Sequence, residues 1–280
     1  MSKQELQAYQ ANVERWHQQR IDSLLSEEGW LNLAGLYWLE PGVNTFGTGA
    51  DRDIQFPEGS VSPNAGIFML INNRVTARFH PHANILVNGL KVFEATIFDP
   101  ESTEKITMDH ENYRWIIIRR EDKFGIRLRD LKHPRLKKFN GIERFPVNSD
   151  FRFEATLQVS DTIRTIEITN VLGQVTRQYS PGTLRFAHQG KSYTLDVIDE
   201  GNGGDYFVVF GDQTNGKTTY DAGRFLYVPR PGADGLVMLD FNQSINPPCA
   251  FSPFATCPLP PPQNHIDLMV ESGEKKFHLD

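Results

Sequence analysis

The amino-acid sequence predicts a mainly β protein with antiparallel, sandwich-like or barrel-like sheets, one N-terminal amphipathic helix and a proline-rich, extended C-terminal segment. Helical spacing of apolar residues occurs in residues 3–25. After Gly29, short runs rich in Thr, Val, Ile, Phe and Tyr are separated by Gly, Asn, Pro and Asp, which is typical of half-buried strands joined by turns. Seven of the 17 prolines then fall between Asp240 and Asn264, where they exclude helix and central strand.

The predicted helix over residues 3–25 has recognisable ends. Ser2 stands three residues before Glu5, which predicts a capping box at its start, and Gly29 follows its end. We expect one face of this helix to lie across a sheet and to bury Trp16. That face follows the three- and four-residue spacing of Leu6, Tyr9, Val13, Trp16, Arg20, Leu24 and Leu25.

The predicted strands are short, and several are joined by turns of suitable chemistry. Asn72-Asn73, Asn88-Gly89 and Gln189-Gly190 each separate two strand-like runs, and Asn and Gly tolerate the positive φ that tight hairpin turns require. We expect strands at 31–38, 43–47, 66–71, 75–80, 84–87, 90–98, 102–109, 113–120, 124–129, 151–159, 162–169, 174–179, 183–188, 191–198, 205–210, 224–228 and 235–240, with two more at 266–271 and 275–279.

We divide the chain into a helix at 1–28, a β subdomain at 29–130, a connecting loop at 131–150, and a second β subdomain at 151–280 that ends with the proline-rich segment. The loop is charged and is interrupted by prolines. Its basic residues fit a solvated loop or a phosphate-binding patch, and they are Lys132, Arg135, Lys137 and Lys138.

Charge and composition exclude several classes of function. The 280 residues include 29 Lys+Arg and 35 Asp+Glu, which gives a net charge of −6 and argues against a general nucleic-acid or anionic-membrane binder. We find no apolar run of the roughly 18–20 residues that a membrane helix needs, and no secretory signal at the N-terminus. With two cysteines, which do not make a disulfide framework, we expect a cytoplasmic protein.

Three blocks of the sequence resemble the bacterial and archaeal family of unknown function DUF1684. They are GWLNLAGLYWLEPGVNTFGT, then FGIRLRDLKHP with FNGIERFPV, and finally TTYDAGRFLYVP with VMLDFNQSINPPCAFSPFATCPLPPPQN. The similarity extends from about residue 28 to 272. The resemblance implies a β-rich soluble protein and no established reaction.

Residues 44–92 also resemble the forkhead-associated phosphopeptide-binding domain, through NTFGTGADRDIQF, VSPNAGIFML and NILVNGLKV. Asn88-Gly89 matches the Asn-Gly of that domain. Gly47-Thr48 stands where its Gly-Arg is found, and Ala65 stands at the histidine of its Ser-x-x-His, counted from Ser62. The resemblance implies a shared hairpin pattern without the arginine that would donate to a phosphate. A phosphopeptide or protein-interaction module is therefore one alternative function.

Our first hypothesis for function is binding of a small polar or anionic ligand in a cleft that the 240–264 segment closes. Arg224 follows a turn and leads into an apolar run, and its guanidinium could hold a carboxylate or phosphate with two hydrogen bonds. An internal salt bridge to Asp212 or Asp240 is the alternative for this arginine. The orienting groups and walls of the cleft would be Asp240, Asn246, Trp38, Tyr220 and Phe251.

The rival hypothesis is a hydrolase-type enzyme in which Cys249 or Asp240 acts and a histidine carries the proton. Cys249 and Cys257 with His265 also allow a zinc site, although their spacing is wider than that of structural zinc motifs. Two buried, reduced thiols explain the pair more simply than zinc or a disulfide. We expect no metal and no cofactor, and both a binding protein and an enzyme fit the sequence.

Overall fold

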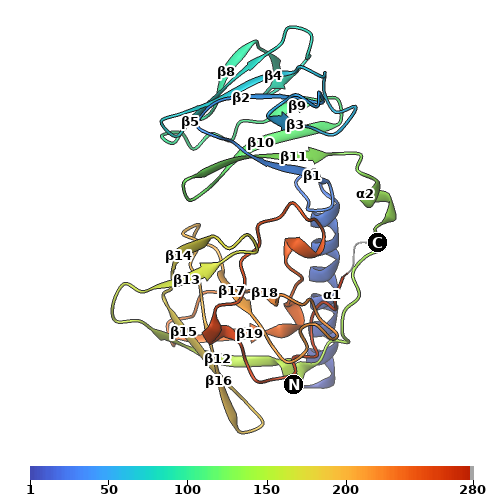
Figure 1. Ribbon diagram of the computed structural model, residues 1–280. Coiled ribbons are helices and arrows are strands. Elements are labelled where there is room, and N and C mark those ends of the chain that lie inside the picture. The colour runs from blue at the N-terminus through green and yellow to red at the C-terminus, as the bar shows by residue number, and fades with distance from the viewer. Residues whose placement is uncertain (278–280) are drawn as a thin grey trace. The chain divides into compact units, whose positions relative to one another are not determined.

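The computed structural model describes residues 1–277 and shows a mainly β chain, with 40% of residues in strands and 14% in helices (Figure 1). The chain divides into two compact units. We call residues 25–139 the sandwich unit, and residues 1–24 with 140–280 the helix-bearing unit. The predicted fold class is confirmed, and the sheets of the described residues do not close into a barrel.

The sandwich unit has a six-stranded sheet in the order β1-β11-β10-β9-β6-β7 and a five-stranded sheet in the order β3-β2-β4-β5-β8. Neighbouring strands are antiparallel except β2 and β3, which are parallel. The strands are β1 (Leu33–Trp38), β2 (Gly42–Gly47), β3 (Ile54–Gln55), β4 (Gly66–Ile71), β5 (Arg74–Phe79), β6 (Leu86–Val87), β7 (Leu90–Lys91), β8 (Glu94–Phe98), β9 (Met108–His110), β10 (Tyr113–Arg120) and β11 (Lys123–Asp130). A short helix, α2 (Pro134–Lys138), follows them.

The core of the sandwich unit lies between its two sheets. Phe46 and Phe68 of the five-stranded sheet belong to the same buried cluster as Trp115 of β10 and Ile126 of β11. Alternate residues of each strand supply this core, as expected where one face of a sheet is buried. The other face of β10 and β11 is therefore free to carry polar side chains.

The helix-bearing unit combines α1 with a four-stranded sheet in the order β16-β15-β12-β19 and with the two-stranded sheets β13-β14 and β17-β18. The buried hydrophobic cluster of this unit includes Phe153, Phe186 and Phe241. The elements are α1 (Lys3–Leu25), η1 (Ser149–Phe151), β12 (Arg152–Val159), β13 (Thr165–Thr169), β14 (Val175–Tyr179), β15 (Gly182–His188), β16 (Lys191–Asp196), β17 (Tyr206–Phe210), β18 (Arg224–Val228), β19 (Leu236–Asp240), η2 (Phe241–Gln243), η3 (Pro248–Ala250) and η4 (Pro262–Asn264).

Helix α1 has the predicted bounds and the predicted capping box. The Ser2 amide donates to Glu5 Oε2 at 2.6 Å, and the Glu5 amide donates to Ser2 Oγ at 3.3 Å. Val13 and Leu24 of the predicted face are buried, while Trp16 is half-buried. The helix thus packs against its unit along the stripe that the sequence indicates. No helix within residues 1–277 has the length and apolar character needed to cross a membrane.

Turn chemistry is also as predicted. Asn88 and Gly89 have φ values of +46° and +78°, and Gln189 and Gly190 have +49° and +79°. Each pair joins two antiparallel strands, because residues with a small or amide side chain adopt this left-handed conformation at low cost.

The two predicted C-terminal strands are wrong within the described residues. Residues 266–271 and 275–277 form no strand, and 278–279 lie outside the described residues. The carbonyl oxygens of Val270 and Ser272 accept hydrogen bonds from the Arg224 guanidinium. A buried side chain therefore holds this segment in place of a strand partner.

Candidate functional site

Strand β11 places arginines on the face of its sheet that points away from the sandwich core. Phe124, Ile126 and Leu128 point into the core, so Arg127 and Arg129 point outward. Arg114 of β10 lies opposite Arg129 in the register and shares its face. We call this surface the arginine face, and its charged members on the two strands are Arg114, Arg120, Lys123, Arg127 and Arg129.

Arg127 occupies an apolar position on the arginine face. It pairs with Leu36 of β1 on one side and with Ile116 of β10 on the other. The Trp30 ring lies against its guanidinium, with 5.2 Å from Cζ to the ring centroid. Only 8% of Arg127 is exposed. A permanently charged group is thus held among apolar neighbours.

The guanidinium of Arg127 has unused hydrogen-bond donors. Its Nε and Nη2 atoms are both buried and have no acceptor in residues 1–277. Other buried side chains of these residues, such as Arg224 and Asn246, leave one atom without a partner. In arginine, Nε and Nη2 are the two donors of one edge, which is the edge that binds a carboxylate or phosphate with two parallel hydrogen bonds.

The electrostatic surroundings of Arg127 are unfavourable to its charge. Burial, followed by repulsion from Arg120 and Arg129, lowers the pKa of the Arg127 guanidinium to about 10. The group remains protonated at neutral pH. An anion at this position would relieve both the desolvation and the repulsion.

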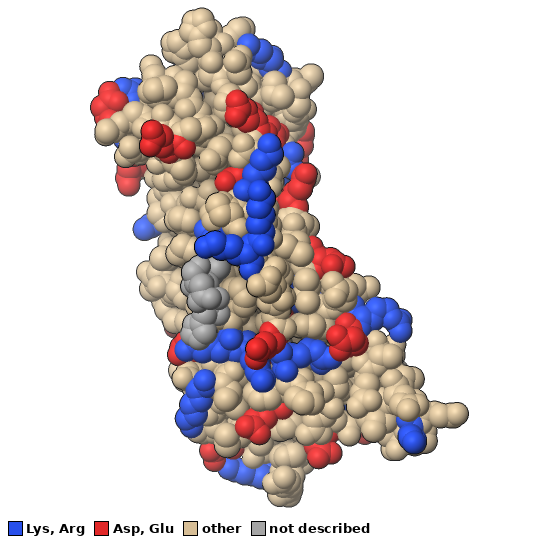
Figure 2. All heavy atoms as spheres, turned by 90° about the vertical axis from the view of Figure 1, so that its right-hand side faces the viewer, with Lys and Arg blue, Asp and Glu red and all other residues tan. Residues whose placement is uncertain are grey.

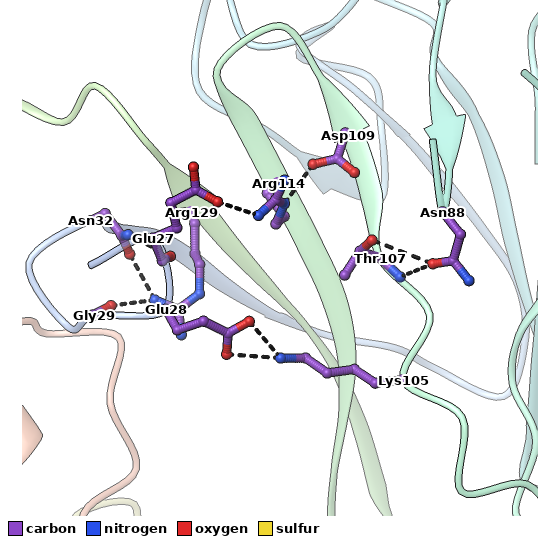
Figure 3. A network of polar contacts seen from close by, with 10 residues as sticks. All are labelled: Glu27, Glu28, Gly29, Asn32, Asn88, Lys105, Thr107, Asp109, Arg114 and Arg129. Carbon is purple, nitrogen blue, oxygen red and sulfur yellow. Dashed lines mark hydrogen bonds and ion pairs between the residues drawn. The ribbon is translucent and has the colours of Figure 1, made fainter. Parts of the chain in front are cut away.

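Arg129, on the same face of the same strand, has protein acceptors for its Nη1 atom. It donates to the Gly29 carbonyl oxygen and, at 2.7 Å, to Asn32 Oδ1 (Figure 3). The Asn32 amide in turn donates to the Ser26 and Glu27 carbonyl oxygens at 3.1 and 2.7 Å. Arg129 therefore fixes the turn over residues 26–32, which carries Trp30.

Ion pairs of exposed side chains also hold the turn over residues 26–32. Glu27 accepts from Arg114 at 2.8 Å, and Arg114 also donates to Asp109 at 2.6 Å (Figure 3). Glu28 accepts from Lys105 at 2.7 Å and 2.8 Å through its two carboxylate oxygens. These contacts hold the turn, and with it Trp30, in position beside Arg127.

Trp38 is the one sequence-predicted site residue that lies in the sandwich unit. Trp38 is the last residue of β1 and pairs with Gly125 of β11. Gly125 is two residues before Arg127, so Trp38 lies on the same face of the sheet as Arg127. A Cβ atom at Gly125 would lie 3.0 Å from the Trp38 ring, so the glycine lets the indole lie close to the strand. Trp38 therefore adds a second aromatic ring to the arginine face.

Arg224, the predicted anion anchor, is fully buried in the helix-bearing unit. Its Nη2 donates to Asp212 at 2.7 Å and to the Val270 carbonyl oxygen at 2.8 Å, and its Nη1 donates to the Ser272 carbonyl oxygen. Burial lowers the pKa of Arg224, and Asp212 opposes that shift. This is the internal salt bridge that the sequence offered as the alternative.

The other predicted ligand-binding residues of this unit also have internal partners. The backbone and side-chain amides of Asn246 donate to Glu274 Oε2 at 2.6 and 2.9 Å, and Asn246 is fully buried. The Tyr220 carbonyl oxygen accepts from Asn215 at 3.2 Å. Burial, with the nearby Asp221 charge, raises the pKa of the Tyr220 phenol.

Asp240, a predicted catalytic residue, caps the 3-10 helix η2 by accepting from the Asn242 amide at 3.0 Å. Both of its carboxylate oxygens accept from the Tyr9 hydroxyl at 2.8 Å. Burial, followed by the Asp240 charge, raises the pKa of the Tyr9 phenol. The carboxylate thus ties α1 to the end of β19.

Cys249, the other predicted catalytic residue, forms a disulfide with Cys257. The simpler expectation of two reduced thiols is wrong in this structure, because η3 turns the chain back and brings the two Cα atoms to 6.1 Å. No group of three or more His, Cys, Asp or Glu side chains suited to a metal ion occurs in residues 1–277.

Polar residues of the forkhead-like stretch have hydrogen-bond partners within the sandwich unit. Asn88 Oδ1 accepts from the Thr107 amide at 2.9 Å (Figure 3). The Asn88 Nδ2 atom donates to Glu104 at 3.2 Å. Arg52 pairs with Asp51 and donates to Asn64 Oδ1 at 3.4 Å. These contacts fix the loops at this end of the sandwich unit.

Three comparisons place the chain among known proteins. The family described as "Protein of unknown function (DUF1684)" matches residues 137–275. The chain belongs to this family. No curated protein matches the chain. A solution NMR structure of an uncharacterized protein from Haloarcula marismortui is similar to it, with 33% sequence identity and a TM-score of 0.41 over 50% of this chain and 78% of that one.

The DUF1684 match and the arginine face occupy different parts of the chain. Arg224, Asp240, Asn246 and Cys249 fall within the matched residues 137–275 and are held by internal contacts. Arg127 falls outside them. The site with unused donors therefore lies in the part of this DUF1684 protein that the family match does not cover.

Several exposed cations elsewhere in residues 1–277 have a carboxylate partner. Lys191 pairs with Asp267 at 2.6 Å in the helix-bearing unit, and Arg78 pairs with Glu94 at 3.0 Å in the sandwich unit. On the face that Figure 2 shows, basic and acidic side chains likewise lie beside one another. Arg127 differs because it is buried and has no carboxylate partner within residues 1–277. The alternation in KFGIRLRD was the sequence signal that could have placed Arg127, together with Arg129, on the outward face of the strand.

Proposed function

We propose that this protein binds a small oxyanion ligand at the arginine face of the sandwich unit. The observation that carries the proposal is the Nε–Nη2 edge of Arg127, which is buried and has no acceptor among residues 1–277. The proposal keeps the ligand class expected from the sequence and moves the anchor from Arg224 to Arg127. Arg224 already has Asp212 as its counter-charge.

The energetics favour an anion at this edge. A buried charge without a partner is strongly destabilising, whereas a bidentate, charge-assisted pair offsets much of the desolvation. Since Leu36 and Ile116 flank Arg127 in the sheet, the local environment strengthens any interaction with an anion. A bound carboxylate or phosphate would therefore stabilise the folded unit.

The surroundings are those of a ligand site in which few polar groups converge on an apolar wall. Trp30, Trp38, Leu36 and Ile116 supply apolar surface beside the charged edge. The ion pairs around residues 26–32 position Trp30 in advance, which reduces the entropy lost on binding. Because both nitrogens are shielded from solvent, an anion reaches them only after neighbouring side chains move aside.

The test is a thermal-shift titration of the full chain with sodium sulfate and sodium acetate, against sodium chloride at matched ionic strength. We expect an oxyanion to raise the melting temperature of the wild-type protein and to have no such effect on Arg127→Met. Arg78→Met, which removes an exposed cation from the five-stranded sheet, is the matched control and should respond like wild type. Equal responses of wild type and Arg127→Met would overturn the proposal.

A further inference from the structure

We infer that the ligand of the arginine face is a carboxylate carried on an apolar body, such as an aromatic acid, and that inorganic dianions bind there less tightly. This inference rests on the proposed function and names the ligand class of the same site. It follows from the two unused donors of Arg127, from the cost of dehydrating an anion among apolar strand neighbours, and from the aromatic surface beside Gly125.

The donors that Arg127 leaves unused match one carboxylate. Its Nε and Nη2 atoms are buried and have no acceptor in residues 1–277. A carboxylate has two oxygens, and both are satisfied when it pairs with one edge of a guanidinium. Sulfate and inorganic phosphate have four oxygens, so the remaining ones need donors from elsewhere. The side chains that flank Arg127 in the sheet, Leu36 and Ile116, have no donor to offer.

The other cations of the arginine face have interactions of their own or lie at the end of the hairpin. Arg114 pairs with two carboxylates, and Arg129 Nη1 has two protein acceptors. Arg120 Nη1 donates to the carbonyl oxygen of the preceding residue at 3.1 Å. Lys123 is exposed and pairs with Arg120 in the register, next to the β10–β11 turn. These charges attract any anion, while the hydrogen bonds that select the ligand are those of Arg127.

The charge of the ligand sets the cost of reaching this edge. Because Nε and Nη2 of Arg127 are shielded from solvent, an anion loses much of its hydration before it pairs with them. The Born cost grows with the square of the charge, so dehydrating a dianion costs about four times as much as dehydrating a monoanion of similar size, whereas its attraction to a guanidinium only about doubles. A carboxylate is therefore favoured, and inorganic dianions occupy the edge only at higher concentration.

An apolar surface lies beside the charged edge. A Cβ atom at Gly125, two residues before Arg127, would lie 3.0 Å from the Trp38 ring and 3.3 Å from Leu36 Cδ1, so both side chains lie close over the glycine. Trp38 and Leu36 are half-buried, as is Trp30 against the guanidinium, so each keeps part of its apolar surface exposed. A flat organic group attached to the carboxylate would cover this surface, whereas acetate has one methyl group to do so.

Calorimetric titration of the full chain with benzoate, acetate, sulfate and benzamide, at pH 7.5 and constant ionic strength, tests the inference. We expect benzoate to bind at least about tenfold more tightly than acetate, because its ring buries apolar area. Benzoate should also bind more tightly than sulfate. Benzamide has the same ring and no charge, so we expect no measurable binding. If acetate, sulfate or benzamide bound as tightly as benzoate, the inference would be overturned.

A change to the apolar surface tests where the ring of benzoate lies. Trp38→Ala should lower the affinity for benzoate to nearly that for acetate, and should change the affinity for acetate by less than about twofold. Phe93→Ala, which removes an exposed aromatic ring outside the arginine face, is the matched control and should bind benzoate like wild type. An unchanged benzoate affinity in Trp38→Ala would contradict the placement of the apolar body.

The inference and the proposed function fail in different ways. Arg127→Met should abolish the binding of benzoate and of acetate. Equal affinities of the wild-type protein for the two acids, both lost in Arg127→Met, would overturn the apolar body and leave the oxyanion site standing. If no anion bound the wild-type protein, the proposed function itself would fail. The wild-type affinities decide both questions even where a variant does not fold.

Discussion

Arg224 in the helix-bearing unit and Arg127 in the sandwich unit are both buried, and they differ in what surrounds the charge. Arg224 in the helix-bearing unit has the Asp212 carboxylate and two carbonyl oxygens as acceptors. Arg127 in the sandwich unit has an aromatic ring and apolar strand neighbours, and two of its nitrogens have no acceptor in the described part of the chain. Burial of an arginine therefore does not by itself indicate a binding site. The feature that indicates a binding site is a buried arginine side chain without a counter-charge.

Removal of the counter-charge from Arg224 should have the largest effect on stability. Asp212→Ala leaves Arg224 buried without a carboxylate, and we expect the unfolding free energy of the helix-bearing unit to fall by about 3–5 kcal/mol. Hydrogen exchange of peptides from β17 and β18 during urea titration measures this loss. Asp267→Ala, at an exposed ion pair of the same unit, is the control. A loss as small as that of the control would show that Arg224 tolerates burial alone.

Removal of the disulfide should have the next largest effect on stability. The disulfide lies entirely within the helix-bearing unit. Its cysteines are eight residues apart, and closure of so short a loop stabilises a protein by about 2–3 kcal/mol. We expect the double variant Cys249→Ala/Cys257→Ala to lower the melting temperature of this unit. Anion binding at the arginine face should be unchanged. Loss of anion binding in the double variant would mean that the two units do not act separately.

Substitution by methionine should change the unfolding free energy of the sandwich unit in opposite directions at Arg127 and at Arg129. Arg129→Met breaks the hydrogen bonds to Gly29 and Asn32 and should destabilise the sandwich unit by about 2 kcal/mol. Arg127→Met removes a charge without a partner and should stabilise it by roughly 1–2 kcal/mol in anion-free buffer. Urea unfolding followed by tryptophan fluorescence measures both. A destabilised Arg127→Met variant would indicate a structural role for this arginine.

The outer ion pairs of the 26–32 turn should matter least. Glu28→Gln weakens the exposed pair with Lys105, and we expect a loss of roughly 0.2–1 kcal/mol that disappears at high salt. The same variant should weaken anion binding slightly, because Trp30 is held less firmly. Thermal melting at low and high salt checks the first effect. A salt-independent loss would contradict the exposed-pair assignment.

The sequence predicts the secondary structure of this protein well, because the signals are local. Ser2 and Glu5 mark the start of α1, and Asn88-Gly89 marks a hairpin through its positive φ. The strand prediction from the sequence fails at the C-terminal tail. There the Val270 carbonyl oxygen accepts a hydrogen bond from Arg224, a residue 46 positions earlier in the chain. Long-range contacts of this kind have no local pattern to reveal them.

In the candidate site too, the sequence predicts local features and does not predict long-range contacts. Arg224 was a reasonable anion anchor from its position after a turn, but its pairing with Asp212 depends on tertiary structure. Arg127 was visible only as one charged residue in the alternating strand KFGIRLRD. Arg129, two residues along the same strand, follows the same alternation and donates to Gly29 and Asn32. Sequence alone cannot separate the two, because the difference lies in the turn that carries Asn32 and Trp30.

The most direct test of the account is a crystal structure of the protein grown or soaked with selenate, a tetrahedral dianion whose selenium can be located by anomalous scattering. The account predicts a selenium peak at Arg127, with selenate oxygens about 3 Å from both Nε and Nη2. A structure in which these nitrogens donate to acceptors of the protein itself, with no anomalous peak beside them, would contradict it.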